Sequence, residues 1–333
     1  MTDKITLAHG SGGELYRQMV NEIFLPAFSN EIYAELNDSA VCRGADKIAL
    51  TTDSFVVNPL FFPGGDVGSL AVSGTVNDLS VSGAKPLYLT VGMIIEAGFE
   101  TEKLGKICSS IAHTTAEAGV RIVTGDTKVV EKGKCDGIYI NTAGVGVFDE
   151  IHKPVSGHIC EGDVIICSGC IARHGTAIMS ARHSLSFEPA PVSDAAPLFE
   201  LTDALAKAGI EIHAMRDPTR GGVAATLCEW TENTALDIVV DSCSLPVDRR
   251  TESVCSMLGI EPMNIANEGV ILFSVPKAEA SRTVDILRAL KHGADASLCA
   301  EVESGSGKVY MLTEIGAKRR VLMPSGEILP RIC

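Results

Sequence analysis

The sequence contains no run of about 18 uncharged apolar residues, and this absence argues against a membrane-spanning helix. Its start, Met1 to Lys4, lacks the apolar core of a signal peptide. The cysteines number 11, an odd count, and are scattered along the chain, unlike the spacing of a disulfide framework. These absences predict a cytoplasmic protein whose thiols are reduced.

Positive charge is also scarce, because the formal net charge is -14. Nucleic acids and anionic membranes bind positive surfaces, so neither is expected as a partner. An acidic chain that handles phosphates needs a metal cation at its site. Cys167 and Cys170 form the single C-x-x-C, and without a second pair or well-spaced histidines they are more typical of buried small residues than of zinc ligands.

Aromatic residues make up only 5% of the chain, whereas apolar residues reach 46% and glycines number 32. This composition is typical of a compact α/β enzyme, and the length allows two domains. Strands are predicted from the apolar patterns at 48–53, 87–95, 120–126, 164–167, 238–240 and 270–275. Helices are predicted at 67–83, 101–118, 174–183, 195–208, 221–231 and 278–290, with Thr101 as a cap.

Proline, glycine and charged residues at 153–163 predict a domain boundary. We therefore expect an N-terminal segment with a glycine-rich loop at 1–36, a first α/β domain at 37–152 and a second at 153–322. The remaining residues, 323–333, are expected to form a mobile tail.

That tail ends in Cys333, which places a thiol on a movable end of the chain. Ten extended residues reach about 30 Å, so the thiol could carry a covalently attached group between two sites. The neighbouring α-carboxylate disfavours the thiolate, and an active Cys333 therefore needs a base where it docks. The alternative is a terminal cysteine with no role.

The loop Gly10, Ser11, Gly12 and Gly13 exposes backbone N–H groups just before an expected helix start at Glu14. Such a loop can wrap phosphates. It lacks the Lys-Ser/Thr ending of a P-loop, and a simple turn is an equal alternative.

Four carboxylates recur at the expected ends of strands or in loops: Asp38, Asp53, Asp78 and Asp126. Mg²⁺ prefers oxygen ligands and bridges carboxylates to phosphates, so these residues could assemble one nucleotide site. Aspartates at such positions also cap helices and stabilise turns.

Three further segments carry candidate side chains. Thr127 and Lys128 offer a hydroxyl and a cation for phosphate oxygens, although Lys128 could be an ordinary surface lysine. Asp217 and Arg220 precede a glycine pair in a loop suited to anion contact or to a helix cap. Glu268 precedes an expected strand, where partial burial would make it a candidate base for Cys333, and the alternative is a solvated turn residue.

Six segments taken together resemble the HypE family of hydrogenase maturation factors, in the family's order and over almost the entire chain. They are His9–Gly13, Asp53–Gly65, Thr124–Lys128, Arg216–Gly222, Ala266–Gly269 and Pro330–Cys333. The family belongs to the superfamily of aminoimidazole ribonucleotide synthetase, selenophosphate synthetase and thiamine-monophosphate kinase. Two positions depart from the family pattern: Arg173 stands where Asp is more common, and Pro218 where Ala is.

The resemblance implies a two-domain PurM-like α/β fold, in which the N-terminal sheet forms a homodimer interface and ATP binds between the domains. It implies that the carbamoyltransferase HypF loads Cys333 with a carbamoyl group. ATP-dependent dehydration then converts the thiocarboxamide to a thiocyanate, and HypC and HypD accept the cyanide on iron destined for nickel-iron hydrogenase.

The same resemblance implies roles for individual residues. Cys333, Glu268 and Lys128 are the expected catalytic residues, and Asp38, Asp53, Asp78 and Asp126 the expected Mg²⁺ ligands. The expected ATP contacts are Gly10, Ser11, Gly12, Gly13, Thr52, Asp53, Asp78, Asp126, Thr127, Asp217 and Arg220. Two other functions stay open: a small-molecule kinase or synthetase of the same superfamily in which Cys333 is incidental, and an acidic scaffold that binds no nucleotide.

Overall fold

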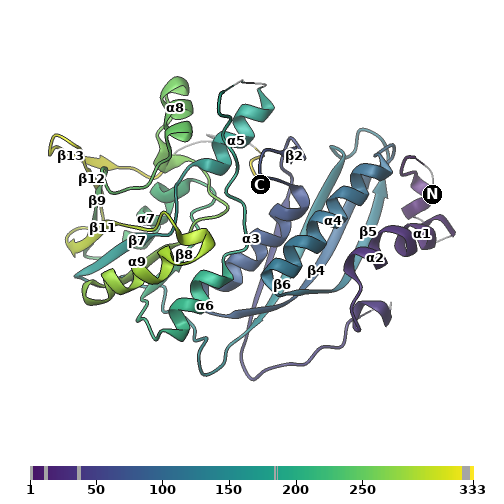
Figure 1. Cartoon of the computed structure of the whole chain (residues 1–333), viewed down its shortest axis with the longest axis horizontal. Coiled ribbons are helices and arrows are strands. Elements are labelled where there is room, and N and C mark those ends of the chain that lie inside the picture. Colours follow the sequence, from purple (N-terminus) through teal and green to yellow (C-terminus); the bar gives the residue numbers. More distant parts are fainter. Residues whose placement is uncertain (1–2, 11–13, 36–38, 184, 186, 325–330) are drawn as a thin grey trace.

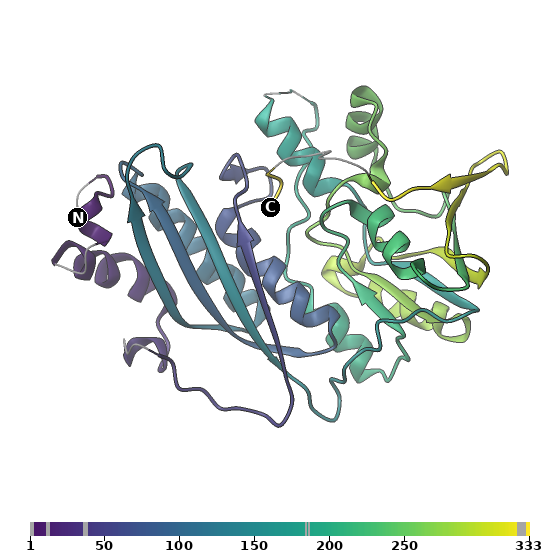
Figure 2. The same ribbon diagram turned by 180° about the vertical axis from the view of Figure 1, so that it is seen from behind.

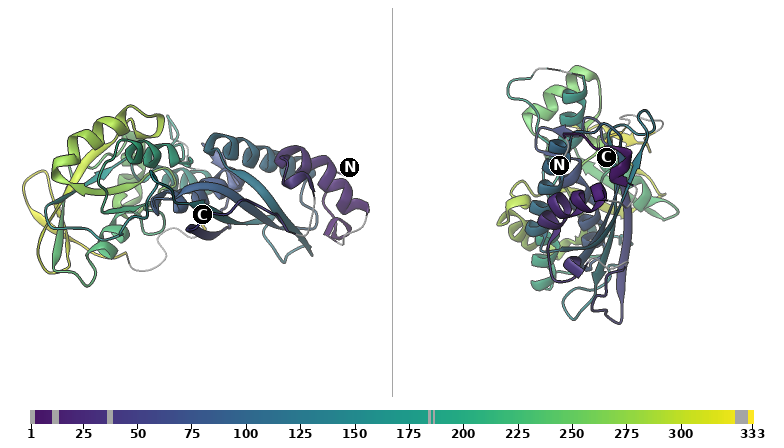
Figure 3. Two further views of the ribbon diagram at one scale, coloured as in Figure 1. Left: turned by 90° about the horizontal axis from the view of Figure 1, so that it is seen from below. Right: turned by 90° about the vertical axis from the view of Figure 1, so that its right-hand side faces the viewer.

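Two β-sheets, one in each half of the chain, organise the molecule into two lobes that lie side by side (Figures 1 and 3). The computed structural model describes residues 3–10, 14–35, 39–183, 185, 187–324 and 331–333. The N-terminus lies at the outer end of the first lobe, whereas the C-terminus returns to the middle of the molecule (Figure 1). Among the described residues, no helix is long and apolar enough to cross a membrane.

The first sheet has four strands in the order β1-β6-β4-β5, so β1 and β5 are its opposite edges. Its strands are β1 (Ile48–Phe55), β4 (Lys85–Glu96), β5 (Arg121–Val130) and β6 (Ile138–Val147). β4 and β5 are parallel and the other pairs are antiparallel. A short hairpin of β2 (Phe61–Phe62) and β3 (Gly65–Asp66) follows β1.

Two helices, α3 (Val67–Val81) and α4 (Thr101–Ala118), cover one face of this sheet (Figure 1). α4 is amphipathic and buries Leu104, Ile107 and Ile111, which recur at helical spacing. α3 is buried on nearly all sides, because it packs between the sheet, α4 and the second lobe. The Asp66 carboxylate caps α3 by accepting from the backbone N–H groups of Gly68 and Ser69.

The other face of the first sheet carries exposed apolar side chains. Leu50 of β1 is 69% exposed and Ile94 of β4 is 44% exposed. Figure 2 shows this face with no helix of the described residues over it. A sheet face of this kind is typical of a surface that another molecule covers.

Short helices precede the first sheet and pack along its β5 edge. They are η1 (Leu7–Gly10), α1 (Glu14–Met19), η2 (Val20–Phe24), α2 (Leu25–Phe28) and η3 (Tyr33–Glu35). Phe24 and Phe28 are buried in the same core as the strands. The expected helix start at Glu14 is confirmed.

The second sheet has seven strands in the order β13-β12-β9-β11-β7-β10-β8. They are β7 (Asp163–Cys167), β8 (Ala214–Arg216), β9 (Leu236–Asp241), β10 (Leu272–Pro276), β11 (Ser297–Ser304), β12 (Val309–Leu312) and β13 (Lys318–Val321). Neighbouring strands are antiparallel except β9 and β12.

Helices cover both faces of the second sheet, and each face has its own core. They are α6 (Phe199–Lys207), α7 (Gly222–Thr231), α8 (Arg249–Leu258) and α9 (Ala280–Arg288), with the short η4 (Pro262–Asn264), η5 (Lys277–Glu279) and η6 (Lys291–Gly293). α5 (Arg173–Arg182) packs instead on α8 and β2. Leu201 and Leu287 of α6 and α9 pack on one face, whereas Val223 and Leu227 of α7 pack on the other.

Three local predictions were wrong. Asp53 and Asp126 do not end their strands but lie inside β1 and β5, because ladder pairing with β6 and β4 continues past them. The helix predicted at 195–208 begins at Phe199 as α6. Thr101 is the first residue of α4 rather than its cap, since Glu100 holds the extended cap position without a side-chain bond.

Candidate active site

A cavity of about 170 Å³ lies where the two lobes meet, and residues from distant parts of the chain line it. The lining residues are Thr52, Asp53, Gly74, Asp78, Asp217, Thr219, Arg220, Glu268 and Cys333. Most of them are candidate site residues of the sequence. The terminal thiol therefore lies beside the glutamate that was predicted to act as its base.

The first lobe contributes Asp53 from β1 and Asp78 from α3. The hydroxyl of Thr51 donates to the Asp78 carboxylate at 2.7 Å, which joins strand and helix. Gly74 of α3 lets the two elements approach, because a Cβ there would lie 2.9 Å from the Phe55 ring. The two carboxylates are thus held by the packing of α3 on β1.

The second lobe contributes two loops, and buried asparagine side chains hold them. Asn267 accepts from the backbone N–H of Ala172 at 2.6 Å and donates to the carbonyl of Pro218 at 2.8 Å. Asn77 of α3 donates to the carbonyl of Glu268 at 3.3 Å, which connects the two lobes at the site. These bonds hold the backbone around Glu268, whose side chain is buried.

The Glu268 loop also lies directly on Asp194. A Cβ at Gly269 would lie 1.8 Å from the Asp194 carbonyl oxygen, so only glycine fits there. The Asp194 carboxylate accepts from the backbone N–H of Gly269 at 3.1 Å. The close backbone contact explains why glycine follows Glu268.

The cavity carries an excess of acidic groups. Burial, and then the nearby Asp217 and Asp194, raise the pKa of Glu268 well above its ordinary value. Burial, and then Asp78, raise the pKa of Asp217 to about 8. Burial also raises the pKa values of Asp53 and Asp78. Ionisation of these carboxyl groups is therefore disfavoured, and a cation in the cavity would offset this.

The thiol of Cys333 shares this environment. Burial, and then the Glu268 charge, raise its pKa to about 12, and Arg220 offsets this in part. Cys333 is therefore a neutral thiol in the docked tail. Nucleophilic use of the sulfur requires either a base or a different location of the tail.

The pKa of Asp217 predicts how stability depends on pH. A carboxyl group whose pKa is higher in the folded chain than in the unfolded chain stabilises the fold while it is protonated. This stabilisation is full below the pKa of the unfolded chain, and it is lost as the pH rises through the pKa of the folded chain. Without divalent cations, the free energy of unfolding of the parent chain should therefore fall as the pH rises from 6 to 8. In Asp217→Asn this fall should be smaller by about 1 kcal/mol per pH unit.

Chemical denaturation at several pH values measures this slope. Asp285→Asn, which changes an exposed carboxylate of α9, is the matched control and should behave like the parent chain. Equal slopes for all three proteins would mean that Asp217 is ionised in the folded state.

The tail docks beside the segment that directly follows β1. The backbone N–H of Val56 donates to an oxygen of the terminal α-carboxylate of Cys333 at 3.1 Å, and that of Asn58 donates to the Arg331 carbonyl at 3.3 Å. Ile332 is buried in the core of the first lobe. Since 325–330 lie outside the described residues, the predicted tail is known only at its two ends.

Two side chains of α5 hold the same tail. His174 is fully buried, and burial lowers its pKa to about 4, so its ring is neutral. Its Nε2 donates to the Ile332 carbonyl at 2.8 Å, while Nδ1 accepts from the Ser193 hydroxyl at 2.8 Å. Arg182 donates to the Arg331 carbonyl at 2.7 Å. The neighbouring Arg173, which departs from the family pattern, instead lies 3.4 Å from Asp248.

The structure does not bring Asp126 and Lys128 to this cavity within one chain. Both are exposed on β5, and they pair with each other at 2.7 Å. Asp53 is on β1, the opposite edge of the sheet. Of the other predicted site residues, Asp38, Ser11, Gly12 and Gly13 lie outside the described residues.

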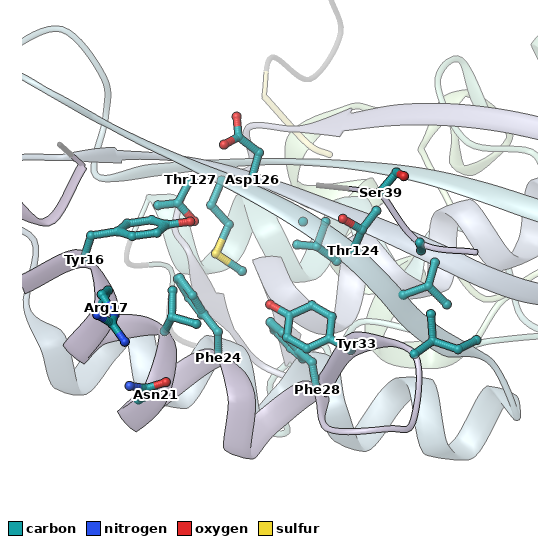
Figure 4. Close-up of a pocket in the computed structure, with 17 residues that line it drawn as sticks. Tyr16, Arg17, Asn21, Phe24, Phe28, Tyr33, Ser39, Thr124, Asp126 and Thr127 are labelled. Atoms are coloured by element: carbon teal, nitrogen blue, oxygen red, sulfur yellow. The ribbon is translucent and has the colours of Figure 1, made fainter. Parts of the chain in front are cut away.

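A second cavity of about 260 Å³ lies between the N-terminal helices and β5. Figure 4 shows the aromatic side chains Tyr16, Phe24, Phe28 and Tyr33 on one side of the sheet, with Thr127 near Tyr16. The carboxylate of Asp126 points to the other side (Figure 4). Gly10 packs against the same strand, since a Cβ there would lie 2.9 Å from Val129. Gly10 and Thr127 therefore lie at this location, whereas the Asp126 side chain faces away from it.

Sequence reasoning missed Asn77, Asn267, Asp194 and His174. The two asparagines directly precede the predicted Asp78 and Glu268, and an amide beside a candidate carboxylate in an apolar stretch was an available signal. His174 and Asp194 had no such neighbour.

Comparison with known proteins decides the family. Models named "AIR synthase related protein" match this chain with an N-terminal domain at residues 36–148 and a C-terminal domain at residues 161–312. Carbamoyl dehydratase HypE of Bradyrhizobium diazoefficiens is 45% identical over 99% of this chain and 96% of its own length. Carbamoyl dehydratase HypE of Escherichia coli is 41% identical over 99% of this chain and 100% of its own. The chain belongs to the HypE family.

Solved HypE structures have the same fold. A HypE in complex with ATP superposes with a TM-score of 0.94 at 39% identity, covering 98% of this chain and 99% of that one. A chain of a HypE-HypF complex superposes with a TM-score of 0.81 at 45% identity, covering 92% and 99%. The predicted two-domain PurM-like α/β fold and the HypE resemblance are confirmed.

Proposed function

We propose that this chain uses ATP to dehydrate a carbamoyl group on Cys333 to a thiocyanate and so supplies cyanide for the iron of nickel-iron hydrogenase. The observation that carries the proposal is the docking of the terminal Cys333 beside the buried Glu268. A scaffold would need neither a docked thiol nor a buried carboxyl group beside it. Dehydratase names among relatives of 41 to 45% identity support the same activity.

The chemistry needs a phosphoryl donor and a base. The carbamoyl oxygen is a poor leaving group, and transfer of the γ-phosphoryl group of ATP to it creates a better one. The nitrogen then loses two protons, the C–O bond breaks with release of phosphate, and the C≡N bond forms. Glu268 in its carboxylate form is the proposed acceptor for these protons.

The acidic cavity fits Mg²⁺. Asp53 and Asp78 offer oxygen ligands, and because burial disfavours their charged forms, a cation there would stabilise both carboxylates. A bound Mg²⁺ would neutralise phosphate charge there. Asp38 and Asp126 remain predicted ligands, the first outside the described residues and the second on β5.

The aromatic cavity beside β5 is the proposed place of the nucleoside. Its size and aromatic lining suit a base and ribose, and Gly10 packs on Val129 of the same strand β5. The similar HypE in complex with ATP supports ATP as the nucleotide. Thr127 lies in this cavity, whereas Thr52, Asp217 and Arg220 face the Cys333 cavity.

A homodimer would bring the exposed side of β5 of one copy to the Cys333 cavity of the other. The exposed sheet face with Leu50 and Ile94 is the proposed interface. When two copies stack these faces about a two-fold axis along the strands, β1 of one copy lies over β5 of the other. Lys128 and Asp126 would then reach the Cys333 cavity from the partner subunit.

Other maturation proteins are the proposed partners. The HypE-HypF complex among the similar structures supports HypF as the carbamoyl donor. HypC and HypD are the proposed acceptor of the cyanide, and the cytoplasm is the proposed compartment.

Intact-protein mass spectrometry tests the function. Incubation with HypF, carbamoyl phosphate and ATP should add one carbamoyl group to Cys333, and Mg-ATP should then remove one water from that adduct. Mapping of the C-terminal peptide locates both changes. If no adduct forms on Cys333 and ATP is used on a free metabolite, the chain is instead a small-molecule kinase of the same superfamily.

A further inference from the structure

A second group of reactive side chains lies in the second lobe, away from the cavities described above. Cys160, Asp163 and His213 place one sulfur, one carboxylate oxygen and one ring nitrogen within 4.8 Å of one another. Asp163 begins β7, and His213 directly precedes β8. The three residues therefore meet at one end of the seven-stranded sheet, where both strands start.

Two of these three residues are already oriented by neighbours. The Asp163 carboxylate accepts from the Ser274 hydroxyl at 2.7 Å and from the backbone N–H of Cys160 at 2.9 Å. Nδ1 of His213 lies 2.9 Å from the same carboxylate, while Nε2 lies 3.3 Å from the Glu211 carboxylate. A carboxylate on the far nitrogen of an imidazole fixes its tautomer and increases its basicity, which is the arrangement around metal-bound histidines.

The side chains can close on an ion without moving the sheet. Ligand atoms on a tetrahedral zinc ion are about 3.3–3.8 Å apart. The Asp163 carboxylate and Nδ1 of His213 are 2.9 Å apart, which is close to that separation. Cys160 is exposed and begins a turn, so rotation of its side chain can bring the sulfur to the ion. Asp163 is buried and serves as the fixed member of the set.

The donor set selects the kind of metal. A thiolate, an imidazole and a carboxylate suit Zn²⁺ and related transition-metal cations, whereas Mg²⁺ takes oxygen ligands. Three protein ligands leave a fourth position for water. With Glu211 next to His213, the local charge is negative and favours a dication.

We propose that Cys160, Asp163 and His213 form a binding site for Zn²⁺ or a similar divalent transition-metal ion, with Glu211 as a positioning residue on His213. The site is separate from the proposed dehydration and ties the turn before β7 to the start of β8. It would make the second lobe of this chain sensitive to such metals.

Metal binding to the full-length reduced chain tests the proposal. Co²⁺ should produce the near-ultraviolet charge-transfer band of a cobalt thiolate, and Zn²⁺ should abolish that band at one equivalent. Cys160→Ser should remove the band, and His213→Gln should weaken Zn²⁺ binding at least tenfold in competition with a chromophoric chelator. Glu211→Gln, a change of an exposed outer partner, should weaken it about tenfold.

Matched controls separate this site from other thiols and acids of the chain. Cys243→Ser changes another exposed cysteine, and Glu314→Gln another exposed glutamate, so both should bind Co²⁺ and Zn²⁺ as the parent chain does. Circular dichroism checks that each variant is folded. The proposal is overturned if the parent chain shows no cobalt-thiolate band, or if the band persists in Cys160→Ser or disappears in Cys243→Ser.

Discussion

Replacement of Glu268 by Gln should slow dehydration of the carbamoylated Cys333 by about 10²- to 10⁴-fold, the usual contribution of a general base. Gln has nearly the same volume and keeps the backbone bonds to Asn77 and Asp194, but it accepts no proton. Loading of Cys333 and binding of ATP should change little. Single-turnover mass spectrometry after addition of Mg-ATP measures the loss of water directly.

The pH dependence sharpens this prediction. Because the pKa of Glu268 is raised, the carboxylate fraction increases about tenfold per pH unit below that pKa, and the dehydration rate of the parent chain should rise with pH. Glu268→Gln should lose this rise. Glu303→Gln, which changes an exposed glutamate of β11, is the control and should keep both rate and slope. A rate in Glu268→Gln equal to that of the control would remove Glu268 from proton transfer.

Mixing two inactive variants should restore activity if each site needs two copies of the chain. Lys128→Ala lacks the proposed cation, and Cys333→Ser lacks the carrier thiol. In a mixed dimer, one site combines Cys333 from the first variant with Lys128 from the second and is complete. Random exchange makes about half of the dimers mixed, each with one complete site, so about a quarter of the parent activity should return.

The assay is dehydration after the two variants are unfolded together, refolded and loaded by HypF. A mixture of Lys128→Ala with Lys128→Ala,Cys333→Ser is the control, because no dimer in it has a complete site. If the first mixture stays as inactive as this control while mixed dimers are present, Lys128 does not act across the interface. High activity of Lys128→Ala alone would instead remove Lys128 from catalysis.

Elements with a strong local pattern were predictable. α4 begins and ends at the predicted Thr101 and Ala118, since its apolar residues recur at helical spacing and Gly119 ends it with a positive φ. β6 was not predicted, although it is central in its sheet. Its alternation of apolar residues with Asn141, Thr142 and two glycines, Gly144 and Gly146, gives a weak strand signal. The glycines are required because Leu79 and Ala84 pack closely on them.

Candidate site residues were predictable by type but not by location. The sequence suggested one acidic site, whereas the order β1-β6-β4-β5 puts Asp53 and Asp126 on opposite edges. Strand order depends on long-range pairing, which residue patterns do not encode locally. The roles of Asn77 and His174 were hidden for the same reason, since their partners are 191 and 158 residues away along the chain.

The sequence by itself determined the α/β class, the family and the chemical groups that the chain offers, because these depend on residue types in a fixed order. Only the tertiary structure decided that Cys333 lies beside Glu268, that burial raises the pKa values of both groups, and that Lys128 is exposed on β5, away from them. Contacts between the lobes create that low-dielectric cavity, and a pKa is set by the surroundings of a group rather than by its identity.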